Sequence, residues 1–148
     1  MDSRVHRYSR ELNDRLVEEV IDTPLGKLTF ISERTDSSWN TITKKWWVTD
    51  SNELKIATWI EEHSDWIYKP DIYTIVDQEW GVYGAPTTFF QRVNIMYLYL
   101  NLMGYENGMF ALYDNPIEVM NLFKALEEND ERLIQEINLS PIDISYFC

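Results

Sequence analysis

The sequence GAPTTFF at residues 84–90 opens the stretch, ending at Ile137, that decides the fold. After it, residues 93–103 predict an almost wholly apolar helix, and residues 116–137 predict a long amphipathic helix. The apolar run IDISYF at residues 142–147 then predicts another strand. Strand, helices and strand in this order indicate a β/α crossover, whose two strands need a larger sheet beside them.

Residues 1–49 have the pattern of an antiparallel β meander. Four extended runs lie between turn residues: 5–12, 15–23, 27–35 and 44–49. The pair Asn13-Asp14 favours a hairpin between the first two runs. Thr23-Pro24-Leu25-Gly26 favours a second turn, because proline presets φ and glycine closes the turn. We therefore expect one domain in two parts, the meander at 1–49 and a β/α segment at 50–148.

Capping residues mark the start of two helices. Asp50 and Glu53 have the spacing of a capping box, which predicts a helix from there to about His63. Asn115 and Glu118 have the same spacing at the start of the long helix. Both helices are therefore expected to begin with a side chain that accepts hydrogen bonds from free backbone N–H groups.

Two segments between these helices have weaker patterns. Residues 71–80 predict a further helix, because they follow Pro70 and proline is tolerated in the first helical turn. Residues 105–113 are expected to be a connection, with Gly104 as the C-cap of the apolar helix before it.

Length, composition and charge restrict the class of protein. The 148 residues are 45% hydrophobic and 14% aromatic, which is enough for a folded domain with a core. The formal net charge of −12 disfavours nucleic acids and anionic membrane surfaces as partners, since both are negatively charged. The single cysteine, Cys148, permits no internal disulfide, and residues 1–20 contain no apolar region of a signal peptide. We therefore expect a cytoplasmic protein.

The sequence contains no complete catalytic or metal-binding motif. His6 and His63 are far apart, Cys148 is terminal, and zinc-ligand spacings such as Cys-x-x-Cys are absent. A G-x-S-x-G nucleophile motif and a glycine-rich phosphate loop are absent as well. We therefore assign no catalytic residue, no metal site and no cofactor to this chain.

Three polar residues after the 84–90 run are candidates for lining a pocket: Gln91, Arg92 and Asn94. Residues just beyond the carboxyl end of a strand in a parallel sheet line the ligand crevice. Arg92 could bind a carboxylate with two parallel hydrogen bonds, or it could cap a loop or pair with a surface acid. The Trp46-Trp47 pair has two interpretations as well, a pocket wall or packing against the sheet.

Several segments in a fixed order resemble the uroporphyrinogen decarboxylase-like superfamily, which includes corrinoid-linked methyltransferases. They are TPLGKLTF at 23–30, WVTDSNELK at 47–55, GAPTTFFQR at 84–92, YDNPIEVMNLF at 113–123 and SPIDISYF at 140–147. The resemblance covers nearly the whole chain after about Thr23. It implies an α/β fold, part of a (β/α)8 TIM barrel after an N-terminal antiparallel β meander, with the pocket at the carboxyl ends of the strands.

The same resemblance implies that the chain is a single partial domain, 1–148, in which 50–148 is the barrel segment. Complete methyltransferases of this superfamily use zinc and a corrinoid, and their later half supplies a His and Cys set without counterpart here. The early Arg-rich motif of the decarboxylases is not found either. No catalytic residue is carried over, and Gln91, Arg92 and Asn94 are kept as possible pocket-lining positions.

Two hypotheses on function follow. The first is a fragment of an enzyme that decarboxylates tetrapyrroles or transfers methyl groups with a corrinoid. It would be inactive alone, and its partners would be the remainder of the barrel or a second copy. The second is a standalone acidic, aromatic-rich binding or assembly module that dimerises through its helices, with both C-terminal strands paired with the meander in one closed sheet. The sequence alone assigns no enzymatic reaction.

Overall fold

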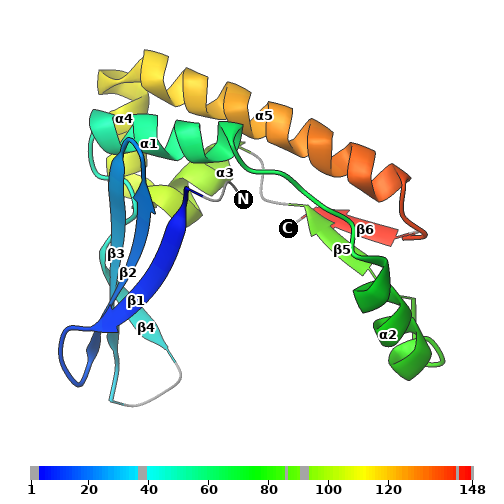
Figure 1. Ribbon diagram of the computed structural model, residues 1–148. Coiled ribbons are helices and arrows are strands. Elements are labelled where there is room, and N and C mark those ends of the chain that lie inside the picture. The colour runs from blue at the N-terminus through cyan, green and yellow to red at the C-terminus, as the bar shows by residue number, and fades with distance from the viewer. Residues whose placement is uncertain (1–3, 37–39, 86, 91–93, 143, 148) are drawn as a thin grey trace.

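A computed structural model describes residues 4–36, 40–85, 87–90, 94–142 and 144–147. Figure 1 shows that the chain forms an arch. One leg is the N-terminal meander, two long helices form the top, and the other leg carries a shorter helix and the C-terminal strand.

The first leg is a four-stranded antiparallel sheet in the order β1-β2-β3-β4. Its strands are β1 (His6–Glu11), β2 (Leu16–Thr23), β3 (Gly26–Arg34) and β4 (Thr41–Lys45). The first turn forms because Asn13 Oδ1 accepts hydrogen bonds from the backbone N–H groups of Arg15 and Leu16, with N···O distances of 2.9 and 2.8 Å. The predicted meander is confirmed, although its fourth strand begins earlier than the run at 44–49.

The helix predicted from Asp50 is α1 (Ser51–Glu62). Asp50 Oδ1 accepts hydrogen bonds from the backbone N–H groups of Asn52 and Glu53, both with N···O distances of 2.8 Å. The Glu53 carboxylate accepts in turn from the backbone N–H of Thr49 at 2.6 Å. The capping residues therefore fix the start of α1, as the sequence predicts.

The long predicted helix is α5 (Pro116–Asn138), but its start differs from the expectation. Asn115 occupies the N-cap position and makes no capping hydrogen bond through its side chain. Its backbone ψ of 50° is far from the extended conformation in which an N-cap side chain reaches the first free N–H groups. The predicted capping box of Asn115 and Glu118 is therefore wrong, and Pro116 in the first turn suits this start instead.

Shorter elements lie between α1 and α5: α2 (Pro70–Trp80), β5 (Thr87–Phe90), α3 (Asn94–Tyr97), the π-helix η1 (Leu98–Leu102) and α4 (Gly104–Asp114). The connection expected at 105–113 is therefore wrong, because these residues belong to α4. The buried residues of α4 are the small residues Gly104, Gly108 and Ala111, so a search for large apolar side chains misses its inner face. A Cβ at Gly108 would lie 2.5 Å from the Tyr99 ring, which shows how closely α4 approaches η1.

The last strand, β6 (Ile144–Phe147), lies parallel to β5. Thr87 is opposite Ile144, and Phe90 is opposite Phe147. The predicted crossover is therefore present as a local unit of two parallel strands joined by helices. Among the described residues, β5 and β6 pair only with each other and form a sheet of their own.

The expected barrel segment at 50–148 is wrong. The structure has an antiparallel sheet of four strands and a separate parallel pair, while α1 and α5 pack along each other at the top of the arch. A closed sheet that joins β5 and β6 to the meander is wrong for the same reason. A crossover pattern sets the relative direction of two strands, but it does not set how many strands lie beside them.

The core lies where the meander, α1, η1 and α5 meet. Its largest fully buried side chains are Leu28, Val48, Leu54, Leu98, Val119 and Leu122. In contrast, α2 in the other leg contributes no buried residue. The two legs of the arch therefore differ in how much apolar surface they leave in contact with solvent.

Candidate functional site

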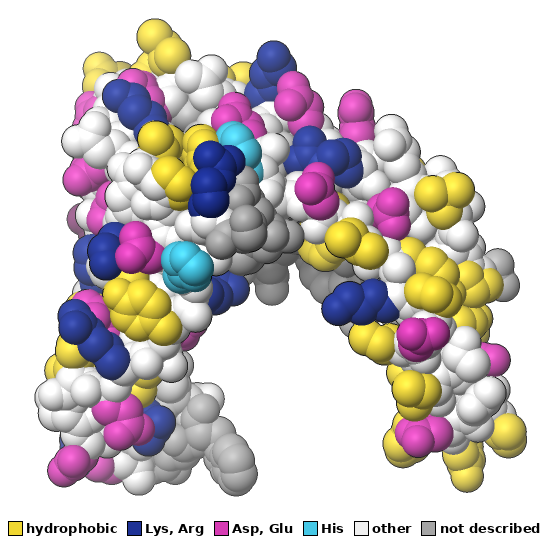
Figure 2. Space-filling model, in the orientation of Figure 1, with side chains coloured by type: hydrophobic (Ala, Val, Ile, Leu, Met, Phe, Trp, Pro, Cys, Tyr) yellow, Lys and Arg dark blue, Asp and Glu magenta, His cyan; other side chains and the backbone are white. Residues whose placement is uncertain are grey.

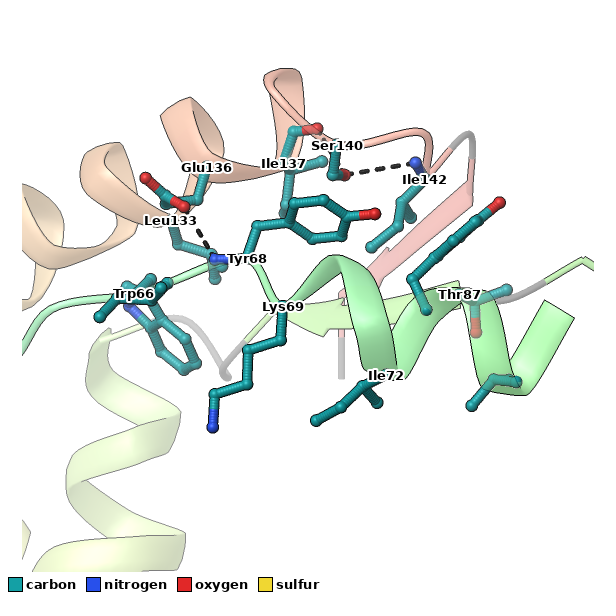
Figure 3. A pocket seen from close by; sticks show the side chains of 13 residues that line it. Trp66, Tyr68, Lys69, Ile72, Thr87, Leu133, Glu136, Ile137, Ser140 and Ile142 are labelled. Carbon is teal, nitrogen blue, oxygen red and sulfur yellow. Dashed lines mark hydrogen bonds between the residues drawn. The ribbon is translucent and has the colours of Figure 1, made fainter.

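An apolar groove lies between α2, the start of β5 and the C-terminal half of α5 (Figure 3). Its volume is about 380 Å³. Apolar and aromatic side chains form most of its wall: Trp66, Tyr68, Ile72, Val76, Leu133 and Ile137. Because β5 contributes Thr87 to the wall, the groove is continuous with the small parallel sheet.

The sequence of α2 and the segment after it explains why this leg exposes apolar surface. Ile72, Ile75 and Val76 in α2 are between 37% and 56% exposed, and Trp80 is 62% exposed. Figure 2 shows hydrophobic side chains gathered on this leg of the arch. Contiguous apolar surface of this kind marks interaction sites in soluble proteins.

The polar groups of the groove hold its walls together. The backbone N–H of Tyr68 donates to Glu136 Oε2 at 2.8 Å, which ties the segment before α2 to α5. Ser140 Oγ donates to the Ile137 carbonyl at 2.8 Å and accepts from the Ile142 N–H at 3.2 Å. In Figure 3, Lys69 points away from α5. The groove therefore presents mainly apolar surface, which suits contact with an apolar surface of another molecule.

Both strands of the small sheet have an edge without a partner strand among the described residues. Their sequences, TTFF and ISYF, contain no charged residue. Charged residues and prolines on edge strands are what natural proteins use to prevent pairing with other chains. The edges of this sheet lack that protection, and only their short length limits pairing.

A buried polar cluster of Glu61, Tyr97 and Asn129, called the Glu61 cluster, connects three helices. Glu61 in α1 is 9% exposed, and its Oε2 accepts a hydrogen bond from Asn129 Nδ2 of α5 at 2.7 Å. Its Oε1 accepts a longer one from the Tyr97 hydroxyl of α3 at 3.4 Å. Burial raises the pKa of Glu61, and the hydrogen bonds from Asn129 and Tyr97 offset part of that rise.

The raised pKa of Glu61 predicts a pH dependence of stability. The folded state holds the proton of Glu61 more tightly than the unfolded state, so this contribution is fully present below the unfolded pKa and is lost as pH rises through the folded pKa. Glu61→Gln does not titrate, so its stability relative to the parent chain is expected to increase as pH rises above the ordinary glutamate pKa of about 4.3. Urea unfolding at several pH values measures this difference.

The control for Glu61→Gln is the neighbouring substitution Glu62→Gln, since Glu62 is exposed on the same helix. We expect its stability relative to the parent chain to change little with pH. Equal pH profiles for the two variants would show that burial does not raise the pKa of Glu61.

The structure treats the three residues predicted to line a pocket differently. Gln91 and Arg92 lie outside the described residues. Asn94 begins α3, and its Nδ2 donates to the Phe123 carbonyl at 3.4 Å and to Glu127 Oε1 at 3.2 Å. These contacts join α3 to α5, and the pocket-lining role of the three residues stays a prediction.

The tryptophan pair fulfils both of its interpretations. Trp46 and Trp47 both contact Phe30 of the meander, Trp46 edge-on at 6.2 Å and Trp47 stacked at 5.4 Å between ring centroids. Trp47 also lines a second cavity together with Glu61. The Trp47 ring therefore packs against Phe30 of the meander and also forms part of a cavity wall.

The ligands of a metal site do not converge in the described part of the chain. No three His, Cys, Asp or Glu side chains there are close enough to hold a metal ion. The described residues therefore do not fit the zinc that the resemblance implies for the methyltransferases, and Cys148 lies outside them.

Among the described residues, no helix combines the length and the apolar composition that crossing a lipid bilayer requires. The candidate functional features among the described residues are the apolar groove, the open parallel sheet and the Glu61 cluster. Comparisons with protein-family models, with curated proteins and with solved structures found no match for this chain.

Proposed function

We propose that this chain is an assembly module that dimerises through the leg containing α2, β5 and β6. The observation that carries the proposal is the two-stranded parallel sheet with open edges beside the apolar groove. A two-stranded sheet has little stability by itself in water, and parallel sheets are normally covered on both faces. A second copy supplies further strands and a cover for the apolar surface.

A two-fold dimer is the simplest arrangement, because the same surface of both copies then forms the contact. A two-fold axis perpendicular to the sheet at its edge places the same strand of the two copies antiparallel, so that two pairs join in one four-stranded sheet. The uncharged sequences of β5 and β6 bring no like charges together when either strand meets its copy.

Electrostatic repulsion between the two copies opposes this dimer. Each copy carries a net charge of −12, which opposes dimerisation at low ionic strength. Of the described residues that line the groove, Lys69 and Glu136 alone are charged, so this part of the contact is mainly apolar. The dimer should therefore become stronger as salt screens the repulsion between the two copies.

Ile72→Asp is expected to raise the dissociation constant of the dimer at least about tenfold. Ile72 lies in the groove and is 56% exposed, so an aspartate there folds without difficulty but loses its hydration in the dimer contact. Gel filtration with light scattering and sedimentation equilibrium, between about 1 and 100 μM protein, measure the change.

The matched control is Ile42→Asp, because Ile42 is 50% exposed on β4 in the other leg. It should dimerise like the parent chain. A parent chain that stays monomeric over this range contradicts the proposal, and so does equal dimerisation of the two aspartate variants.

A second candidate function is the one implied by the resemblance to the uroporphyrinogen decarboxylase-like superfamily. The parallel crossover from β5 to β6 favours it, because parallel strands joined by helices are the repeating unit of the fold that the resemblance implies. A different polypeptide would then complete the open sheet, and tetrapyrrole decarboxylation or corrinoid-linked methyl transfer would belong to the whole assembly. Aggregation of the parent chain, or its recruitment of a complementary chain, favours this candidate over the dimeric module. Because the single cysteine permits no internal disulfide, both candidate functions are compatible with the reducing cytoplasm.

A further inference from the structure

A second cavity lies between the meander, α1, η1 and α5, and we call it the meander cavity. Its volume of about 450 Å³ falls within the range of small-molecule sites, roughly 300–1,000 Å³. Ile21, Leu28 and Leu102 contribute apolar surface to its wall. Trp66 is the one residue that it shares with the apolar groove, so its occupation can be tested separately from dimerisation.

Aromatic side chains give the meander cavity flat surfaces. Trp47, Trp66 and Tyr97 all line it. Trp47 is held by its stacking on Phe30, and Tyr97 is held by its hydrogen bond to Glu61. Rigid aromatic walls favour a planar ligand, because ring stacking adds to the burial of apolar area.

The carboxylate of Glu61 is a buried hydrogen-bonding group in the cavity wall. A carboxylate offers about four acceptor positions on its two oxygens. Among the described residues two donors occupy it, Asn129 Nδ2 at 2.7 Å and, more weakly, the Tyr97 hydroxyl at 3.4 Å. The Glu61 carboxylate is largely desolvated and can still accept further hydrogen bonds. An N–H or O–H group of a ligand would therefore be bound strongly there.

The charges around the cavity disfavour an anion. Glu61 and Asp65 both line the wall, and the chain has a net charge of −12, so a negative ligand is repelled. Arg7 also lines the wall, with its guanidinium carbon 5.5 Å from the Trp47 ring centroid, and offsets part of this negative charge.

We propose that the meander cavity binds a small, planar aromatic molecule that is not an anion and donates an N–H hydrogen bond to Glu61. The three requirements come from separate observations: the aromatic wall, the negative charge around the cavity, and the remaining acceptor capacity of Glu61. The cavity shares only Trp66 with the groove of the proposed dimer contact.

Indole and benzofuran form a matched pair of probes, because they have nearly the same shape and only indole has an N–H. We expect indole to bind with a dissociation constant between about 10 μM and 1 mM, and benzofuran to bind at least about fivefold more weakly. Isothermal titration calorimetry measures both constants, and saturation-transfer NMR confirms contact with each probe. Absence of indole binding, or equal affinity for the two probes, would overturn the proposal.

Two tryptophan substitutions locate the bound probe. Asn101 is an exposed residue that lines the cavity from η1, so Asn101→Trp fills the cavity and should weaken indole binding more than about tenfold. Asn107→Trp is the control, since Asn107 is exposed on α4 and is not among the cavity residues. Unchanged indole binding by Asn101→Trp would place the probe elsewhere and overturn the proposal.

Glu61→Gln tests the hydrogen bond itself. The substitution replaces one acceptor oxygen with an NH2 donor, so the preference for indole over benzofuran should shrink by at least about threefold. Urea unfolding establishes that the variant is folded before it is titrated. A preference that is the same in the variant and in the parent chain would exclude Glu61 as the acceptor.

Discussion

Replacing Leu122 with alanine is expected to lower the free energy of unfolding by about 2–5 kcal/mol, the range for truncating a packed leucine. Leu122 is 0% exposed in the apolar stripe of α5 and belongs to the same core cluster as Leu54 and Leu98. Its removal leaves a cavity where α5 meets the rest of the core, which well-packed helices fill only in part. Urea unfolding followed by far-ultraviolet circular dichroism measures the loss.

Leu139→Ala is the control for this prediction, because Leu139 ends α5 with 77% of its surface exposed. The same truncation there should change the free energy of unfolding by less than about 0.5 kcal/mol. Similar losses at the two positions would mean that α5 does not form the core contact described for it.

Local signals are sufficient to predict much of this fold. Asn13 forms the first turn and Asp50 caps α1 through contacts with residues two or three positions away. The parallel direction of β5 and β6 follows from the order of strand, helices and strand. Such predictions succeed because each depends on one segment and its neighbours.

Predictions that depend on distant partners could not be made in the same way. The barrel expectation needed the number of strands beside β5 and β6, which no local pattern contains. Glu61 is one of 25 acidic residues in the sequence, and its partner Asn129 is 68 positions away. A signal was nevertheless present: Glu61 follows Leu54 by seven positions and Ala57 by four, which places it on the buried face of α1.

Gly104→Ala is expected to destabilise the protein by at least about 2 kcal/mol, because two costs act together. Gly104 has a φ of +76°, a left-handed conformation that costs other residues roughly 1–2 kcal/mol. A Cβ there would also lie 2.5 Å from Trp46 Nε1, so the indole, which contacts the Phe30 ring edge-on, would have to shift. Urea unfolding gives the stability, and near-ultraviolet circular dichroism reports the displaced indole.

Gly84→Ala is the matched control, since a Cβ at Gly84 would meet no atom within 4 Å and its φ is not positive. It should change stability by less than about 0.5 kcal/mol. The two costs at Gly104 separate when Gly104→Ala is combined with Trp46→Ala, because the contact with the indole is then absent while the backbone strain stays. If Gly104→Ala lowers the free energy of unfolding by the same amount with and without Trp46→Ala, then contact with Trp46 is not the reason that this position requires glycine.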